Sequence, residues 1–310
     1  MYIEGTGPFY VGYANIEQYL RGIIYIMYRA EHPNPQFERD TYTCLNGEWE
    51  FEIGKSSEKM NTSLSSKIEV PFCMESKLSG IHNTDFITDC MYSREIEVKQ
   101  SDLEGRFVLH FGAVDYKTEV YVNGEKAGEH KGGYTAFEVE ITPFVTVGKN
   151  RITVVVHDDI TENVPSGKQS RKRESFGCFY TRVTGIWQTV WLERTPKEYI
   201  KQIKFYPNIA DGSVRTEIIS EGKAATEITV YYDGRQVGKA TGDGYYRHDY
   251  EIKLAEKHLW EIGNGRLYDV IIKFGDDEVK SYFGLREVKF EKRKFLLNGK
   301  SIFQRLVLDQ

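Results

Sequence analysis

The sequence lacks the features that mark membrane, exported and nucleic-acid-binding proteins. Its longest apolar run, residues 22–28, is far shorter than the ~20 residues of a membrane-spanning helix. The acidic Glu4 and Glu17 precede this run, where a signal peptide carries positive charge. The formal net charge is −5, so no overall basic field is available to hold a nucleic-acid backbone. We therefore expect a soluble, unexported chain with neither a membrane nor a nucleic acid as its partner.

Cysteine is also scarce. The four cysteines are widely spaced and form no CxxC pair, and they are few for a disulfide-stapled fold of this length. Reduced thiols in a cytoplasm are therefore the expected state. The residues concerned are Cys44, Cys73, Cys90 and Cys178.

The usual catalytic and cofactor-binding motifs are absent. The sequence contains no GxSxG, no GxxxxGK[ST], no HExxH, and no GxGxxG after a strand. Its seven histidines never reach the spacing of metal ligands. His110 and His157 lie in apolar strands and are predicted to be hydrogen-bonded structural residues. We expect neither a metal nor a cofactor.

Composition and apolar pattern favour an all-β fold. The 28 glycines, 21 tyrosines and 17 phenylalanines stand against 8 prolines, which is typical of strands joined by tight turns. Apolar residues alternate with polar ones along residues 106–111, 151–157 and 268–274, which predicts half-buried strands. The one helical pattern covers residues 16–27, where apolar residues recur at helical spacing behind Asn15.

Three dipeptides predict two-residue β-hairpins. Asn and Asp followed by Gly adopt positive φ readily, which suits the turns that connect antiparallel strands. Antiparallel pairing is therefore the expected local rule. The dipeptides are Asn123-Gly124, Asp233-Gly234 and Asn298-Gly299.

The length of 310 residues predicts two or three domains. Residues 1–30 are an N-terminal extension, and residues 31–195 look like a large β-sandwich. Residues 196–290 have the length and strand rhythm of an immunoglobulin-like sandwich, and residues 291–310 start a further part. The segment 158–177 has no apolar periodicity, and unstructured connections of that length are usually functional or mobile.

The charged residues of this segment are predicted to be solvated. Three acids at its start have no apolar neighbour to raise a pKa, so they are interpreted as a solvated loop rather than a catalytic pair of carboxylates. Four bases lack interleaved aromatics, which favours a flexible surface loop over a nucleic-acid groove. The acids are Asp158, Asp159 and Glu162, and the bases are Lys168, Arg171, Lys172 and Arg173.

Two interpretations of GIWQTVWLE, residues 185–193, stay open. As one strand, this segment places Trp187 and Trp191 on one face and its aliphatic residues on the other. The indoles could stack on sugar rings. Alternatively, the strand is covered by its own core on one side and by a neighbouring domain on the other, which its two-sided apolarity favours.

Six ordered segments carry a resemblance to a known family. They are LNGEWEF at residues 45–51, VPFCMESKLSGI at 70–81, the hairpin region at 106–142, RVTGIWQTVWLE at 182–193, FGLREVKF at 283–290 and FLLNGKSIFQRLVLDQ at 295–310. The first four resemble the N-terminal sugar-binding sandwich of glycoside hydrolase family 2, the β-galactosidase and β-glucuronidase family. The fifth is similar to the end of that family's immunoglobulin-like domain, and the sixth to the opening of its (β/α)8 barrel.

The resemblance implies a jelly-roll-like sugar-binding β-sandwich, an immunoglobulin-like β-sandwich and the first strand of a truncated (β/α)8 barrel. In this family the general acid and the nucleophile are glutamates on later barrel strands, so no catalytic residue is assigned and the isolated chain is expected to be inactive. The implied candidates at the rim of the substrate pocket are Phe179, Tyr180, Arg182, Asp309 and Gln310.

Two departures from the family pattern bear on the sugar. Many members have an aspartate at the position of Phe179, and many read Arg-Gly-Val-Asn where this chain has residues 305–308. The leading hypothesis is the set of non-catalytic N-terminal domains of a retaining β-glycosidase, whose partners are carbohydrate and its own missing catalytic barrel. The alternative is a freestanding carbohydrate-binding or adhesion module of two β-sandwiches. The sequence leaves open the sugar, the linkage and whether a homo-oligomer forms.

Overall fold

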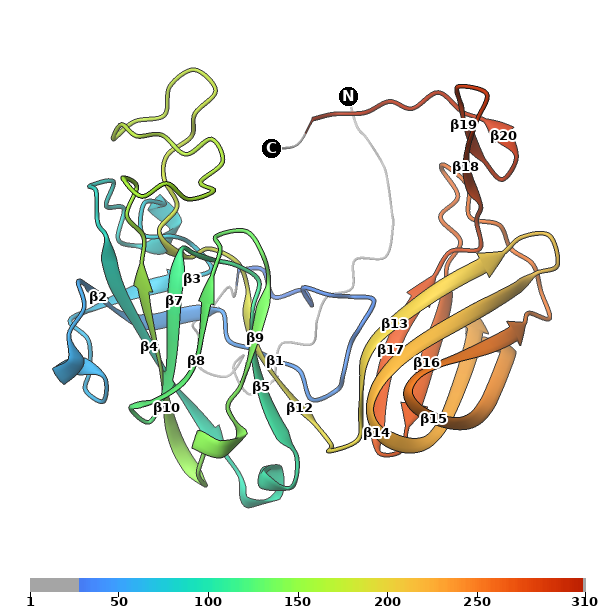
Figure 1. Cartoon of the computed structure of the whole chain (residues 1–310), viewed down its shortest axis with the longest axis horizontal. Helices are drawn as coiled ribbons and strands as arrows, with labels where there is room; N and C mark the ends of the chain where they lie inside the picture. The colour runs from blue at the N-terminus through green and yellow to red at the C-terminus, as the bar shows by residue number, and fades with distance from the viewer. Residues whose placement is uncertain (1–27, 309–310) are drawn as a thin grey trace, which may run out of the picture. The chain divides into compact units, whose positions relative to one another are not determined.

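The computed structural model describes residues 28–308, whose regular secondary structure consists of β-strands and a few short 3-10 helices (Figure 1). The predicted helix at residues 16–27 lies essentially outside the described residues. No helix among the described residues is long and apolar enough to cross a membrane. The strands are β1 (Thr43–Cys44), β2 (Gly47–Ile53), β3 (Ser66–Val70), β4 (Asp89–Val98), β5 (Arg106–Phe111), β6 (Val114–Asp115), β7 (Lys117–Val122), β8 (Glu125–Lys131), β9 (Phe137–Glu140), β10 (Gly148–His157), β11 (Gly185–Ile186), β12 (Val190–Thr195), β13 (Tyr199–Asn208), β14 (Ser213–Tyr232), β15 (Arg235–Lys253), β16 (Tyr268–Phe274), β17 (Asp277–Phe283), β18 (Val288–Glu291), β19 (Lys294–Leu297) and β20 (Lys300–Ser301). Short 3-10 helices are η2 (Ser57–Lys59), η3 (Lys77–Ser79), η4 (Gln100–Glu104) and η5 (Thr142–Phe144). The all-β prediction is confirmed.

The chain divides into two compact units. Of the described residues, the first contains 28–33, Thr43–Leu103 and Val108–Leu192. The second contains Asn34–Tyr42, Glu104–Phe107 and residues 193–308.

The first unit contains a six-stranded antiparallel sheet in the order β3-β2-β4-β10-β7-β8 and a sheet in the order β1-β12-β5-β9. A two-stranded sheet pairs β11 with β6. Large side chains from both main sheets are completely buried, as expected for a core between sheets. Examples are Phe51, Tyr92, Leu109, Phe111 and Val154.

The central strand β10 is more buried than its pattern predicts. Alternation predicts a half-buried strand at residues 151–157, yet every residue from Ile152 to Val156 is buried. The reason is tertiary, because Leu64 and Met91 pack against Val155 on the outer face of the sheet. The prediction of a half-buried strand is therefore wrong for β10, whereas β16 alternates as predicted.

The three predicted hairpins are confirmed. Asn123 and Gly124 have φ of 52° and 84° between β7 and β8. Asp233-Gly234 and Asn298-Gly299 likewise combine two positive φ values in two-residue turns. Asn, Asp and Gly tolerate this conformation at low cost, so a local signal was sufficient.

The segment GIWQTVWLE is not one strand. It splits into β11 and β12, which belong to different sheets. Thr189, in the link between these two strands, accepts a hydrogen bond at its carbonyl from the backbone N–H of Gly112 at 2.8 Å. Trp187 donates from Nε1 to the carbonyl of Gly133 at 2.8 Å, whereas Trp191 stacks on the ring of His110 with centroids 4.8 Å apart. The expectation of two indoles on one face is wrong, because the chain changes sheets between them.

The second unit is built on one curved sheet in the order β13-β14-β16-β17, with β15 paired to β14. β14 and β15 have 20 and 19 residues, far beyond the usual ~3 to 10. The register of their pairing shifts between Ile219 and Lys223, a β-bulge that bends such long strands. Ile218, Val230 and Phe274 lie in the core that the sheet encloses.

Arg39 ties the segment Asn34–Tyr42 into the second unit. Its guanidinium donates to both carboxylate oxygens of Asp277 at 2.9 and 3.0 Å and to Glu193 at 3.0 Å. All three side chains are buried. A buried cation is tolerated here because two carboxylates and the carbonyl of Ile200 use its donors.

The C-terminal part forms the small sheet β18-β19-β20. Residues 304–308, predicted as the first barrel strand, form no strand. A strand needs a neighbour for its backbone N–H and C=O groups, and the described residues provide none there. Phe303 and Val307 are 88% and 94% exposed.

Candidate functional site

The segment between β10 and β11, residues 158–184, is held in place by buried polar groups. Gln169 and Ser170 are buried within it. Ser170 donates from its backbone N–H to the carbonyl of Tyr180 at 2.7 Å, and Tyr180 donates to that of Lys168 at 3.0 Å. Apolar periodicity is a poor guide to this segment, because polar side chains and backbone pairing order it.

Asp115 lies beneath this segment and is 3% exposed. Gln169 donates from Nε2 to its carboxylate at 2.6 Å. Burial raises the pKa of Asp115 to about 6 despite this hydrogen bond, and the charge of Glu75 adds to the rise. The pKa of Glu75 is itself raised by burial.

Asp158 is a second carboxyl group of this region, and its charge interacts with that of Asp115. Thr184 donates from Oγ1 to its carboxylate at 3.3 Å. Burial, and then the charge of Asp115, raise the pKa of Asp158 to about 7. The prediction of a solvated Asp158 is therefore wrong, because the following segment folds back over this side chain.

The other two acids of this segment, Asp159 and Glu162, behave as predicted. A hydrogen bond from the Thr161 side chain lowers the pKa of Asp159, and one from Lys117 lowers that of Glu162. Both carboxylates are thus ionised surface groups. The sequence signal that distinguishes Asp158 is its place directly after the buried strand β10.

Arg182, a predicted rim residue, is buried beneath the segment. It donates to the backbone carbonyls of Ser170, Lys172 and Thr84, and its guanidinium lies 4.1 Å from the ring centroid of Phe86. Burial lowers its pKa. In this structure Arg182 fastens the loop through three hydrogen bonds to backbone carbonyls.

The other predicted rim residues separate in space. The hydroxyl of Tyr180 lies 3.3 Å from that of Tyr134, near Gln169. Phe179 is 40% exposed and stacks on Phe176 across a tight turn, with centroids 5.1 Å apart. Asp309 and Gln310 lie outside the described residues. The rim assignment of all five residues stays a prediction.

A pocket of about 450 Å³ opens beside Asp158. Phe86 supplies an aromatic face, and Asp159, Arg171 and Thr184 supply charged or hydroxyl groups. This combination of an apolar wall with a few hydrogen-bonding groups is typical of ligand pockets, and its donors and acceptors suit hydroxyl-rich ligands.

No group of side chains among residues 28–308 could hold a metal ion. The hypothesis that His157 is a hydrogen-bonded structural residue is confirmed, since its Nδ1 lies 3.0 Å from a carboxylate oxygen of Asp89.

Comparisons with known proteins agree on one family. Residues 77–196 match the family model described as glycosyl hydrolases family 2, sugar binding domain. A β-glucuronidase of Streptococcus agalactiae is 27% identical over 86% of this chain and 47% of its own length. A β-galactosidase of Thermoanaerobacter pseudethanolicus is 29% identical over 68% of this chain and 30% of its own length.

Solved structures share the fold. A β-glucuronidase of an uncultured Clostridium sp. superposes with a TM-score of 0.70 at 24% identity, covering 86% of this chain and 48% of that one. A Ruminococcus gnavus β-glucuronidase in complex with uronic deoxynojirimycin gives a TM-score of 0.72 at 21% identity, covering 85% and 48%. The chain therefore spans about half the length, or less, of these relatives.

Proposed function

Since this chain belongs to glycoside hydrolase family 2, we propose that it forms the non-catalytic N-terminal domains of a retaining β-glycosidase. The observation that carries this proposal is the match of residues 77–196 to the family's sugar-binding domain. The relatives named above are called β-glucuronidase and β-galactosidase. The proposed reaction of the full-length protein is accordingly hydrolysis of an O-glycosyl bond in a β-glucuronide or β-galactoside.

In this proposal the chain has three parts after its N-terminal extension. Residues 31–195 are the sugar-binding-type sandwich, 196–290 an immunoglobulin-like sandwich and 291–310 the start of the barrel. The exposed apolar side chains of Phe303, Val307 and Leu308 support a covering partner at this end. A cytoplasmic location stays a prediction from cysteine usage.

Retaining hydrolysis needs a nucleophilic carboxylate and a protonated acid ~5 to 5.5 Å apart on either side of the scissile bond. Asp158 has the raised pKa of a general acid. Its neighbour Asp115, however, is sealed from solvent and bonded to Gln169, so no substrate reaches it. We therefore assign no catalytic role to this pair, and the acid and nucleophile of the proposed enzyme are the barrel glutamates.

Within the enzyme, the role of this chain is to support the barrel and to form part of the wall around the substrate. The pocket beside Asp158 offers the groups for such a wall, and Arg182 holds the loop that carries Arg171. Phe86, packed on Arg182, completes its apolar side.

The test is an activity assay of the purified chain with 4-nitrophenyl β-glucuronide and β-galactoside. We expect no turnover, and turnover by the full-length protein. Turnover by this chain that the Asp158→Asn variant abolishes would overturn the proposal, because the catalytic pair would then lie within residues 1–310.

A freestanding carbohydrate-binding module is the second candidate, and the pocket beside Asp158 is the observation that favours it. Sequencing the gene beyond codon 310 discriminates the two. An in-frame barrel supports the glycosidase, whereas a stop codon at that position supports the module.

A further inference from the structure

Residues 158–184 are held in place without a hydrophobic anchor. No apolar side chain of this range is buried, whereas Val156 before it and Ile186 after it are completely buried. A segment that buries few apolar contacts opens at a lower free energy than the strands around it. Its polar contacts therefore decide how firmly it lies against the first unit.

Three carboxyl groups accept hydrogen bonds from this segment or belong to it. We call Glu75, Asp115 and Asp158 the carboxyl trio. Thr184 donates from its backbone N–H to Glu75 and from Oγ1 to Asp158, at 3.3 Å in each case. Gln169 donates from Nε2 to Asp115 at 2.6 Å. Both donor side chains are buried, so the trio is bridged by the middle and by the end of the segment.

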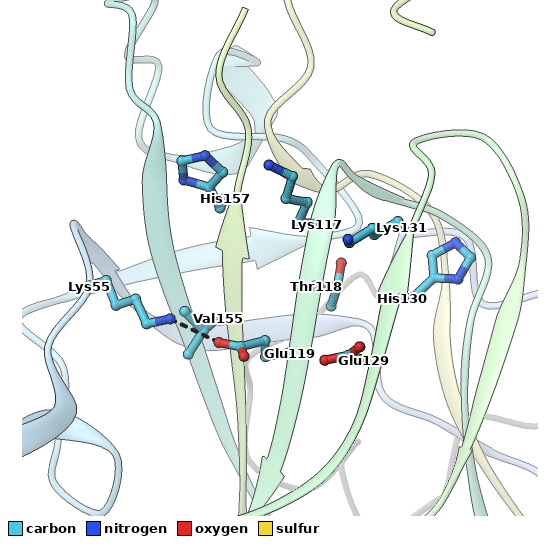
Figure 2. A pocket seen from close by; sticks show the side chains of 9 residues that line it. All are labelled: Lys55, Lys117, Thr118, Glu119, Glu129, His130, Lys131, Val155 and His157. Atoms are coloured by element: carbon cyan, nitrogen blue, oxygen red, sulfur yellow. Dashed lines mark hydrogen bonds and ion pairs between the residues drawn. The ribbon is translucent and has the colours of Figure 1, made fainter. Parts of the chain in front are cut away.

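The carboxyl trio makes no ion pair with any residue that the structure describes. The cations of this region have other partners. Figure 2 draws two of them, Lys117 on β7 and His157 on β10. Lys117 donates to both carboxylate oxygens of Glu162 at 2.7 Å, and Nδ1 of His157 lies 3.0 Å from Asp89. Arg182 donates to backbone carbonyls. Only neutral groups therefore donate to the trio.

The members of the trio disfavour one another's ionisation. Burial is the largest cause of the raised pKa of all three groups. The charge of Glu75 adds to the rise at Asp115, and the charge of Asp115 adds to the rise at Asp158. Neighbouring carboxylates in a poorly solvated site cannot all ionise without a cost in free energy.

The other ionisable groups that face the trio do not reverse this direction. The positive charge of His157 favours ionised Asp158 and the charge of Asp159 disfavours it, and burial outweighs both. Arg182 attracts Glu75 and Asp158 from a distance beyond an ion pair. The remaining groups stay neutral near pH 7, because burial raises their pKa values far above that range. They are Cys73, Cys90, Tyr92 and Tyr134.

We propose that the carboxyl trio is a pH-dependent latch for residues 158–184, tight while the trio is protonated and loosened once it ionises. Opening exposes the same groups to water, where they ionise at lower pH. The stabilisation is therefore complete below the unperturbed pKa of 3.8 for Asp and is lost as the pH rises through about 6 for Asp115 and about 7 for Asp158. Loosening also affects the pocket beside Asp158, because Arg171 and Thr184 line it. The proposal is independent of the glycosidase assignment.

Hydrogen exchange of the chain at pH 5 and pH 8 tests the latch. The reporters are the backbone N–H groups of Val183 and Thr184, which donate to Gln169 at 2.9 Å and to Glu75 at 3.3 Å. The internal control is the set of amides in β16 of the second unit. Protection factors, which are corrected for base catalysis of exchange, should fall about 10- to 100-fold at the reporters between the two pH values. They should not change in β16.

Neutral isosteres separate the trio from other groups that titrate. Asp115→Asn and Asp158→Asn keep an oxygen that accepts a hydrogen bond, so each should reduce the fall in protection and the double variant should nearly abolish it. Asp159→Asn is the matched control, because that carboxylate of the same segment has a lowered pKa and is ionised at both pH values. It should show the fall of the wild-type chain. The wild-type comparison needs no substitution, so it decides the question even where a variant does not fold.

The proposal is overturned if protection at the reporters is equal at the two pH values or higher at pH 8, or if the double variant shows the fall of the wild-type chain. An equal fall in β16 would also contradict it, since the loss of protection would then belong to the whole chain.

Discussion

Replacing Asp158 with Asn should stabilise the chain at neutral and alkaline pH. In the folded state burial and the charge of Asp115 raise the pKa of this carboxyl to about 7, against 3.8 for an unperturbed group. The folded protein therefore holds a proton between pH 3.8 and 7 that the unfolded chain has lost. Stability supplied by the protonated group is complete below pH 3.8 and is lost as the pH rises through 7.

The size of the effect follows from the same shift. A shift of about 3 units at ~1.36 kcal/mol per unit gives about 4 kcal/mol. Asp158 is only partly buried, and solvent screening reduces this penalty, so we expect about 2 kcal/mol. The Asn side chain has nearly the same shape and still accepts from Thr184. Above pH 7 the variant should be more stable than the wild type, and the two should converge below pH 4.

Urea unfolding between pH 4 and 9, followed by tryptophan fluorescence, measures this difference. Trp49, Trp187 and Trp191 lie in the first unit and report its unfolding. Asp159→Asn is the matched control, because that exposed carboxylate has a lowered pKa and its loss should slightly reduce stability at pH 8. A destabilised Asp158→Asn variant at pH 8, or a stability difference that does not change with pH, would refute the reasoning.

Two further substitutions test the packing of each unit. Arg39→Ala leaves two buried carboxylates without their cation and should destabilise the second unit by about 3 to 5 kcal/mol in urea unfolding. Lys239→Ala, which breaks an exposed ion pair with Glu227 in the same unit, should cost less than ~1 kcal/mol. Gly185→Ala combines φ of +83° with a Cβ that would overlap the hydroxyl of Tyr92, so its melting temperature should fall far more than that of Gly54→Ala, whose Cβ meets nothing within 4 Å. Equal losses in either comparison would show that burial and crowding are not the causes.

Local chemistry was enough to predict the β architecture. Alternation at residues 268–274 gave β16, and Asn-Gly or Asp-Gly pairs gave the three hairpins, because each depends only on neighbouring residues. The resemblance to glycoside hydrolase family 2 is confirmed by the match at residues 77–196 and by the β-glucuronidase relative, which aligns with 86% of this chain. The sequence also predicted correctly that Asp159 and Glu162 are solvated.

Contacts between distant segments decided the rest. Asp158 is partly buried because residues 182–184 fold back over it, and Trp187 and Trp191 separate because the chain changes sheets between them. Lys117 and Lys131, fourteen positions apart in the sequence, likewise lie opposite each other only because β7 pairs with β8. A pattern of period two records which residues alternate. It does not contain what covers each face, and that coverage sets the burial and the pKa of the side chains and the shape of the pocket beside Asp158.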